Sequence, residues 1–579
     1  MKKPRVVVLV GSLLLTAGLG VPSLVAGRFQ SAPPPRVADL PWDGFVASFL
    51  DAYFKARPDV AVSAGRHEYD GVLPDWTPAG LNAEVQRLHE QRNRAAAYPE
   101  TALDPRQRFE RDYLLAQVDR DLFWLETADL PHRNPLFYAD ALDPDAYVSR
   151  EYAPLAVRLA AYTRYAHAVP KAVIQLRANT RLPLPRTWIK VSRRALGGLA
   201  DFYAQDVPRV FAEVKDGNLQ SEFRAANAGA IAAMKDLDAW LAAQEPRATE
   251  AFALGPEKFR LMLYATERVD VPLDKLEQMA RSDLDRNLAA LKSACAEFAA
   301  GRSIDECVAK AQAAKPEGDP VEAARKQLEA LRQFVSDHGL LTIPGPEQAL
   351  VRQAPAYKAS NFAYINIPGP YEKGLPSIYY IAPPDPSWPK EKQRDYLPDA
   401  AMLLFTSVHE VWPGHFLQYA HANRAKSKFG QVFVGYAFAE GWAHYTEEMM
   451  WEAGLGKGDP ETYIGQIREA LLRNGRFLSA IGLHTKGMTV AESERMFREE
   501  GHQDPGNAEQ QAERGTYDPA YLNYNMGKLM IRKLREDWTR TRGGRAAWRE
   551  FHDAFLSYGG PPIPLVREAM LGKGSGSLF

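Results

Sequence analysis

Residues 109–125 read FERDYLLAQVDRDLFWL, a pattern that recurs along much of this chain. The apolar side chains return at spacings of three and four residues, so a helix would present one apolar face and one charged face. Residues 276–298 and 323–338 show the same periodicity. Short proline-marked linkers separate such segments between residues 42 and 340. The sequence therefore predicts a mainly α-helical protein.

The segment at residues 341–388 has a different pattern. FAYINI (362–367) and SIYYIA (377–382) are rich in β-branched and aromatic residues, and proline and glycine flank them. We expect a small antiparallel sheet of two to four strands here. The helical pattern returns after residue 399 and continues almost to the end of the chain. The predicted sheet thus comes just before a long helix.

Composition excludes several classes of protein. Hydrophobic residues make up 46% of the 579 residues and charged residues 25%, as in an ordinary soluble globular protein. The formal net charge of -1 provides no broad basic surface, so we expect no nucleic-acid partner. Two cysteines exclude a disulfide-rich scaffold and a metal site built from four thiolates.

Residues 1–27 have the pattern of a secretory signal peptide. The basic start MKKPR precedes an apolar run at residues 6–21, and the small residues Ala26 and Gly27 follow. The run is shorter than the ~18–20 residues of a membrane-spanning helix. We predict export to the periplasm or outside a bacterial cell, without stable membrane insertion after signal removal. A retained N-terminal anchor is the alternative. No cysteine lies near the exit, so we expect no lipid attachment there.

The only two cysteines, Cys295 and Cys307, lie twelve residues apart. A turn at residues 299–303 separates the two helical segments that carry them. In an oxidising compartment, such a pair can join a helix hairpin through a disulfide. Two buried free thiols would give the same sequence pattern, so both interpretations stay open.

The first motif that carries chemistry is HEVWPGH, residues 409–415. In zinc hydrolases, two histidines hold the ion, and the glutamate after the first takes a proton from a metal-activated water. The usual spacing is four residues, whereas six residues turn His415 about 120° away from His409 on an ideal helix. Because Pro413 cannot donate to the carbonyl of His409, and Gly414 tolerates unusual dihedrals, we expect a local break. Such a break could turn His415 back towards an ion; a core or capping histidine pair is the non-catalytic interpretation.

A second motif, AEGWAHYTEEM at residues 439–449, follows about 30 residues after the first. Glu440 and His444 are four residues apart and share a helical face. A site of the two-His-plus-Glu type takes its third ligand from a later helix, which is the role we predict for Glu440. His444 would support the ligands or donate to a developing oxyanion. Glu447 and Glu448 are expected on a solvated edge of this helix.

Two later segments carry further candidates, namely Arg476, His484, Arg514, Tyr517, Tyr521 and Tyr524. A hydrolase of this kind needs phenol or imidazole donors for the tetrahedral intermediate, and often a cation for a substrate carboxylate. His484 and Tyr524 are therefore candidate catalytic residues together with His444. The two arginines, Tyr517 and Tyr521 are candidates for substrate binding. For any single tyrosine, packing or a structural hydrogen bond is the alternative role.

With these motifs, the chain resembles the bacterial family labelled domain of unknown function 885. The resemblance rests on HEVWPGHFLQ, FAEGWAHYTEEM, RFLSAIGLH and YNMG, and it extends to residues 56–77 and 551–571. That family is similar to helical zinc peptidases with a deep substrate channel. The resemblance implies one elongated helical catalytic domain at 28–579, composed of a helical part at 28–340, the sheet at 341–388 and metal-site helices at 399–579. It also implies a single zinc ion held by His409, His415 and Glu440, with Glu410 as the general base.

We therefore predict an exported zinc-dependent peptidase that cleaves short peptides, with carboxypeptidase or dipeptidase action. A metal-dependent hydrolase of some other amide or ester would use the same ligands. A non-catalytic periplasmic peptide-binding protein is the third possibility. The sequence leaves the oligomeric state open.

Overall fold

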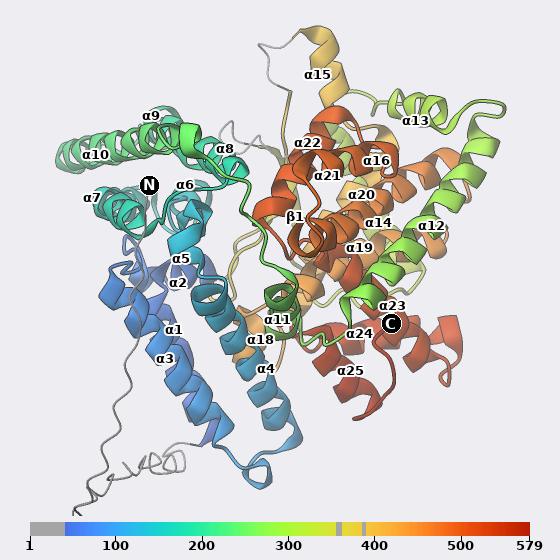
Figure 1. The fold of residues 1–579 in the computed structure, drawn as a ribbon, viewed down its shortest axis with the longest axis horizontal. Helices are drawn as coiled ribbons and strands as arrows, with labels where there is room; N and C mark the ends of the chain where they lie inside the picture. Colours follow the sequence, from blue (N-terminus) through green and yellow to red (C-terminus); the bar gives the residue numbers. More distant parts are fainter. Residues whose placement is uncertain (1–40, 355–361, 385–388) are drawn as a thin grey trace, which may run out of the picture.

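The computed structural model describes residues 41–354, 362–384 and 389–579 (Figure 1). The predicted signal peptide at 1–27 lies outside these residues, as does the start of the predicted domain. Most of the described residues are helical, which confirms the mainly α fold. None of the described helices combines the length and the apolar character that crossing a membrane requires.

The N-terminal helices, drawn in blue to teal, gather on one side of the molecule (Figure 1). Asp104 begins the helix predicted at 109–125: its carboxylate accepts the Gln107 N–H at 2.8 Å, and the Gln107 side chain accepts the Asp104 N–H at 3.1 Å. The elements of this group are α1 (Trp42–Ala56), α2 (Pro58–Ala64), α3 (Pro78–Ala96), α4 (Pro105–Leu122), α5 (Leu130–Arg133), α6 (Asp145–Ser149), α7 (Leu155–Asn179), α8 (Arg186–Ser192), α9 (Gly198–Val210) and α10 (Gly217–Ala242).

The remaining helices form a second group, drawn in green to red. They are α11 (Pro256–Glu267), α12 (Leu273–Phe298), α13 (Ile304–Gln312), α14 (Pro320–Asp337), α15 (Lys390–Tyr396), α16 (Ala400–Glu410), α17 (His415–Ala422), α18 (Lys428–Val432), α19 (Tyr436–Glu452), α20 (Pro460–Thr485), α21 (Val490–Glu499), α22 (Pro505–Tyr517), α23 (Asn523–Thr539), α24 (Trp548–Leu556) and α25 (Ile563–Leu571). Every residue of α20 from Ile464 to His484 is buried, so this helix runs through the interior of the group.

The small sheet lies where the sequence predicts it, but its strands are not all antiparallel. It contains β1 (Ala349–Gln353), β2 (Ala363–Asn366) and β3 (Ser377–Ile381) in the order β1-β3-β2. β3 is antiparallel to β2 and parallel to β1, so the prediction of an antiparallel sheet is wrong for one of its two pairs. A hairpin can join only antiparallel neighbours, whereas the long connection from β1 to β3, which includes β2, permits parallel pairing. β3 is buried at all five positions because it is the central strand.

Cys295 and Cys307 form a disulfide that joins α12 to α13. Both cysteines are buried in the main hydrophobic core of the second group. The structure thereby decides between the two interpretations that the sequence left open. Because the sequence contains no other cysteine, neither thiol is available for any other linkage.

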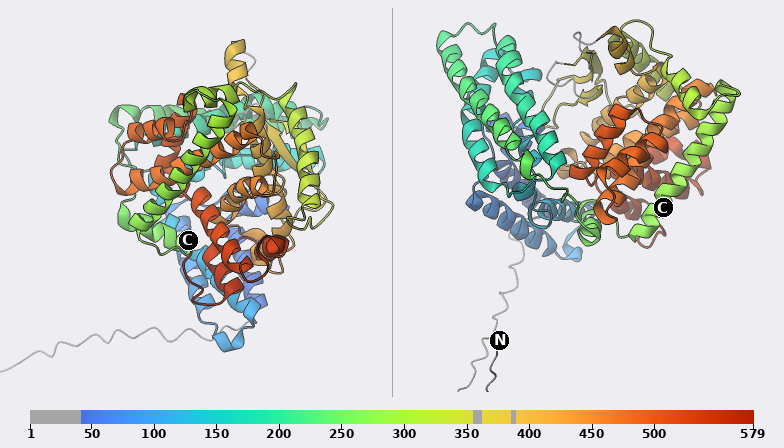
Figure 2. Two further views of the ribbon diagram at one scale, coloured as in Figure 1. Left: turned by 90° about the vertical axis from the view of Figure 1, so that its right-hand side faces the viewer. Right: turned by 45° about the horizontal axis from the view of Figure 1, so that its top comes forward.

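The two groups of helices share a hydrophobic cluster on one side, and they diverge on the other side (Figure 2). Phe429 and Phe433, at α18, pack with apolar residues of α1, α3 and α4 in this cluster. Residues of both groups also line one cavity of about 2340 Å³. Its walls include α4 from the first group, and β2, α16, α19, α20 and α22 from the second. The predicted metal-site motifs lie on α16, α17 and α19, and all three helices contribute residues to the cavity wall.

Candidate metal centre

The helix that carries the first motif breaks inside it. α16 ends at Glu410 and α17 begins at His415, with the predicted break between them. The Gly414 N–H donates to the carbonyl oxygen of Val408 at 3.0 Å. A Cβ atom at Gly414 would lie 1.8 Å from the carbonyl oxygen of His409, so this close approach requires glycine. The break predicted from Pro413 and Gly414 is confirmed.

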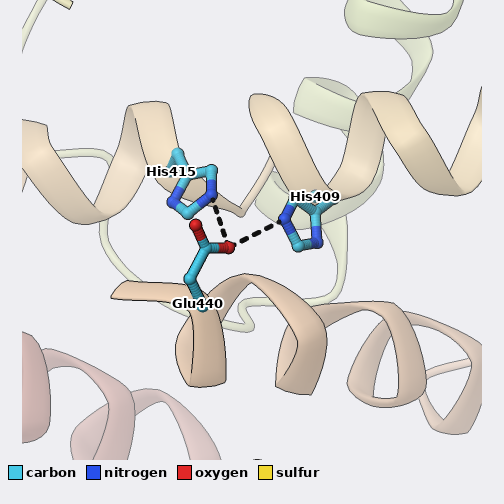
Figure 3. A group of neighbouring side chains, drawn as sticks. All are labelled: His409, His415 and Glu440. Atoms are coloured by element: carbon cyan, nitrogen blue, oxygen red, sulfur yellow. Dashed lines mark ion pairs between the residues drawn. The ribbon is translucent and has the colours of Figure 1, made fainter. Parts of the chain in front are cut away.

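The break brings both histidines of the motif to the same carboxylate. The Nε2 atoms of His409 and His415 each lie 3.3 Å from Oε2 of Glu440 (Figure 3). One potential ligand atom from each of the three residues lies within 4.8 Å of the other two. The prediction that these three side chains converge is confirmed, although they come from three different helices.

The donor set fits a divalent metal ion such as zinc. Two imidazole nitrogens and one carboxylate oxygen are the ligands of a hydrolytic zinc site that keeps a position for water or substrate. Oε2 of Glu440 is buried and has no hydrogen-bond partner among the described residues. Burial opposes the charge of Glu440, but the two histidines hold its pKa well below the usual range. The centre therefore presents an ionised carboxylate oxygen whose polar neighbours among the described residues are the two histidine nitrogens.

Glu447 supports this centre from behind, which the sequence analysis missed. Its Oε1 lies 2.7 Å from Nδ1 of His409, and its Oε2 lies 3.1 Å from Nδ1 of His444. An N–H at Nδ1 of His409 leaves Nε2 free to bind a metal. Burial alone would raise the pKa of Glu447, but Arg473 and His444 hold it far below the usual value. Glu447 is therefore a buried carboxylate.

The prediction of a solvated edge at Glu447 and Glu448 is wrong. Glu447 is fully buried, and Glu448 forms ion pairs of 3.1 Å with Arg286, Lys528 and Arg532. The sequence contains a signal for Glu447, because it lies seven residues after Glu440 and therefore shares its helical face. No comparable local signal reveals the partners of Glu448, which come from distant helices.

A close helix crossing brings Tyr524 to the same centre. A Cβ atom at Gly441 of α19 would lie 2.5 Å from Cα of Gly527 in α23, so the two helices touch at glycine. Tyr524 lies one turn before Gly527 and stacks on His409, with ring centroids 6.2 Å apart. Burial and Glu440 raise the pKa of Tyr524, which keeps its hydroxyl protonated at neutral pH. Tyr524 lines the cavity.

Glu410 also lines the cavity and directly follows His409 in the sequence. Burial raises the pKa of its carboxyl group, although the charges of His415 and His409 partly oppose this shift. A carboxylate with a raised pKa is a stronger base than an exposed glutamate. The placement is compatible with the predicted role of general base.

His444 and His484 are not brought to the cavity. His444 is fully buried behind Glu447, and burial lowers its pKa to about 4. His484 accepts the Leu254 N–H at 3.2 Å through Nδ1, and its Nε2 lies 2.7 Å from the Gly515 carbonyl oxygen. Neither residue is among those that line the cavity. The position of His444 favours support of the ligands, and both ring nitrogens of His484 already have backbone partners.

Three of the four residues predicted to bind substrate line the cavity, namely Arg476, Arg514 and Tyr517. Tyr521 does not: it is fully buried, and its hydroxyl group packs against Gly515. A single tyrosine was expected to have either a binding or a packing role, and the position of Tyr521 favours packing. The sequence spacing of these residues does not distinguish the two roles.

The cavity wall contains a further buried acid, Glu267, which the sequence analysis did not identify. Its Oε1 accepts the Ala437 N–H at 3.2 Å and the Asn523 side-chain N–H at 3.1 Å. Its Oε2 has no hydrogen-bond partner among the described residues. Burial raises the pKa of this carboxyl group to about 7. The folded protein therefore disfavours the ionised form of Glu267.

This raised pKa predicts a pH-dependent effect of Glu267→Gln. When folding raises the pKa of a carboxyl group, the folded protein loses stability as the pH increases from the ordinary pKa of that group to its raised pKa, here about 7. Glutamine keeps the two accepted hydrogen bonds but cannot ionise. We expect the variant to be more stable than the unsubstituted protein by roughly 1–3 kcal/mol at pH 8, with a much smaller difference at pH 5. Urea unfolding at both pH values measures this, and a difference independent of pH would contradict it.

The sequence is similar to one protein family, and the fold is similar to solved structures. The model of the family described as bacterial protein of unknown function (DUF885) matches residues 58–570. A comparison with curated proteins finds no match. Among solved structures, "a putative lipoprotein of unknown function" from Shewanella oneidensis is 23% identical, with a TM-score of 0.75, covering 92% of this chain and 99% of its own.

A second solved structure, "the putative lipoprotein from Colwellia psychrerythraea", is 17% identical, with a TM-score of 0.76. The match covers 91% of this chain and 98% of that one. At these identities the two structures establish a shared fold and no activity. The family match spans most of the sequence, including both motifs of the metal centre. This chain therefore belongs to the DUF885 family of bacterial proteins.

Proposed function

We propose that this protein is an exported zinc-dependent peptidase that cleaves short peptides. The observation that carries the proposal is the convergence of His409, His415 and Glu440 in the wall of a large cavity. A bound zinc ion would supply Lewis acidity for the scissile carbonyl and for the attacking water. A cavity among helices would admit short peptides and exclude folded proteins.

The residues around the centre have complementary roles in this proposal. Glu410 takes a proton from the attacking water while the water oxygen bonds to the acyl carbon. Glu410 then passes that proton to the amine as the C–N bond breaks. The protonated hydroxyl of Tyr524 donates to the oxygen that becomes negative in the tetrahedral state. Glu447 orients His409 through Nδ1. These assignments rest on position and protonation state.

Strand β2 supports a peptide rather than another amide as the substrate. Residues 362–367 all line the cavity, and β2 lies at an edge of the sheet, with β3 as its only strand partner among the described residues. An edge strand has backbone N–H and C=O groups that can pair with an extended peptide. The sheet would thereby align a substrate chain beside the metal centre.

Export is part of the proposal. The signal-peptide pattern of residues 1–27 and the disulfide between Cys295 and Cys307 both favour an oxidising compartment. The descriptions of the two solved structures as lipoproteins point the same way. In this sequence both cysteines are already engaged in the disulfide.

Metal analysis tests the centre directly. The purified protein should contain about one zinc ion per chain after dialysis against zinc, and His415→Ala should lose it, because two remaining ligands hold zinc weakly. His421→Ala is a matched control on the same helix. His421 contacts the Thr342 carbonyl oxygen and not the triad of His409, His415 and Glu440. Loss of zinc in both variants, or no zinc in the unsubstituted protein, would contradict the site.

Turnover distinguishes a peptidase from the alternatives. The zinc-loaded protein should hydrolyse members of a panel of peptides of three to six residues, and His415→Ala should not. Hydrolysis only of non-peptide amides or esters would favour a different hydrolase. Binding of peptides without any hydrolysis would favour a peptide-binding protein.

A further inference from the structure

Three arginines surround the ring of Tyr524 in the cavity wall. The guanidinium carbons of Arg473, Arg476 and Arg514 lie 5.9, 4.5 and 5.6 Å from the ring centroid. The first two lie one helical turn apart on α20, and the third lies on α22. Because Tyr524 also stacks on His409, this positive cluster is adjacent to the metal centre.

The charges of two of these arginines are compensated. Arg473 pairs with Glu469 and lies 3.6 Å from Glu447. Arg514 donates from Nε to Asp518 at 3.0 Å. Each of these guanidinium groups therefore has a carboxylate neighbour within the protein.

Arg476 differs from both of its neighbours. Its Nε–H donates to the neutral side chain of Gln511 at 2.9 Å, and no carboxylate of the described residues pairs with it. Its side chain is only 7% exposed. Burial and the nearby Arg514 lower its pKa to about 10, which leaves it charged at neutral pH. A buried, uncompensated cation is costly unless a ligand supplies the missing negative charge.

We propose that Arg476 binds the free C-terminal carboxylate of the peptide substrate, so that the enzyme removes residues from the C-terminal end. This inference rests on the proposed peptidase function. One uncompensated positive charge matches the single charge of a carboxylate better than the two charges of a phosphate. The planar guanidinium group also has two terminal nitrogens that Gln511 does not use, and these can donate to both carboxylate oxygens.

The distances place this site close to the scissile bond. The guanidinium carbon of Arg476 lies 4.5 Å from the Tyr524 ring centroid, which lies 6.2 Å from that of His409. The separation of Arg476 from the His409 ring is therefore at most about 11 Å, the span of roughly three extended residues. A carboxylate held at Arg476 would present one of the last few peptide bonds to the metal centre. The products are a shortened peptide and the released C-terminal fragment.

A binding experiment tests the carboxylate site without requiring turnover. The probes are N-acetylated tripeptides with different last residues, each prepared as the free acid and as the C-terminal amide. Calorimetry on the zinc-loaded Glu410→Gln protein should show the acids binding at least about 30-fold more tightly than the amides, as expected for a charge-assisted pair. Adding Arg476→Gln should abolish this preference while changing amide affinity less than about twofold, and Arg476→Lys should restore part of it.

Arg468→Gln is the matched control. Arg468 lies on the same helix, lines the same cavity and is equally buried, but its charge is compensated by Asp399 at 2.5 Å. Its removal should leave the ratio of acid to amide affinity unchanged. Loss of the preference in both variants would attribute it to the general cavity potential and overturn the assignment to Arg476. Equal affinity of the Glu410→Gln protein for acids and amides, with all arginines present, would also overturn the assignment.

Turnover separates failure of this inference from failure of the proposed function. The unsubstituted zinc-loaded protein should cleave the acids with a kcat/KM at least about 30-fold above that of the amides, and Arg476→Gln should remove this difference. Equal cleavage of acids and amides would support the peptidase function and contradict the carboxylate site at Arg476. If the acids bind in an Arg476-dependent way but no peptide is cleaved, the result would support the carboxylate site and contradict the peptidase function.

Discussion

Glu410→Gln should lower kcat for peptide hydrolysis by about 1000-fold and leave the zinc content unchanged. Glutamine has nearly the same shape as glutamate but cannot accept the proton of the attacking water, a contribution of roughly 10²–10⁴-fold in general-base catalysis. The triad does not include Glu410, so its ligands stay in place. Steady-state kinetics together with metal analysis of the same preparation measure both quantities.

The comparison with a ligand variant makes this result specific. Glu440→Gln should lose zinc and activity together, because a neutral amide, a much weaker metal ligand, replaces the carboxylate that lies beside His409 and His415. Glu410→Gln should lose activity alone. Undiminished turnover in Glu410→Gln would exclude it as the base, and loss of zinc in that variant would assign it a role in holding the ion.

Glu447→Gln should weaken zinc binding by about 10–100-fold, as expected when the partner of a histidine ligand is altered. The same substitution should destabilise the zinc-free protein by roughly 1–3 kcal/mol, because His409 and His444 lose a buried charged acceptor while Arg473 keeps its ion pair with Glu469. Glutamine can still accept the N–H of His409 or of His444, but it cannot act as an ionised acceptor for both. Zinc competition with a chromophoric chelator and urea unfolding measure the two effects.

Glu448→Gln is the control for this second prediction. Glu448 follows Glu447 on α19 and is also buried, but its ion pairs are with Arg286, Lys528 and Arg532 and not with the triad. Its substitution should lower stability and leave zinc affinity within about threefold, since it alters no partner of a ligand. Equal losses of zinc affinity in both variants would show that the effect is a general consequence of destabilisation.

Patterns in the sequence are sufficient to predict the helices, the position of the sheet and the three side chains that converge. Apolar spacing predicts a helix because neighbouring turns must present one face to the interior. The position of Pro413 predicts the break after His409, because proline lacks the N–H that the helix would use. The helices and the break depend on residues within a few positions of each other, so they can be predicted without knowledge of the fold. The third ligand, Glu440, is predicted instead from a second motif about 30 residues later, as in zinc sites of the two-His-plus-Glu type.

The tertiary structure alone decided which charged groups are buried and which of them lack partners. Glu447 looked solvated in the sequence because its contacts with His409 and Arg473 come from other helices. The central position of β3 also depends on a distant contact, because its parallel partner β1 precedes β2 in the sequence. Arg476 can be distinguished from Arg473 and Arg514 only by the carboxylates that pack beside each one. The sequence by itself determined the helices and the metal-binding residue types, whereas long-range packing, which sets burial and charge compensation, determined the surroundings in which those residues act.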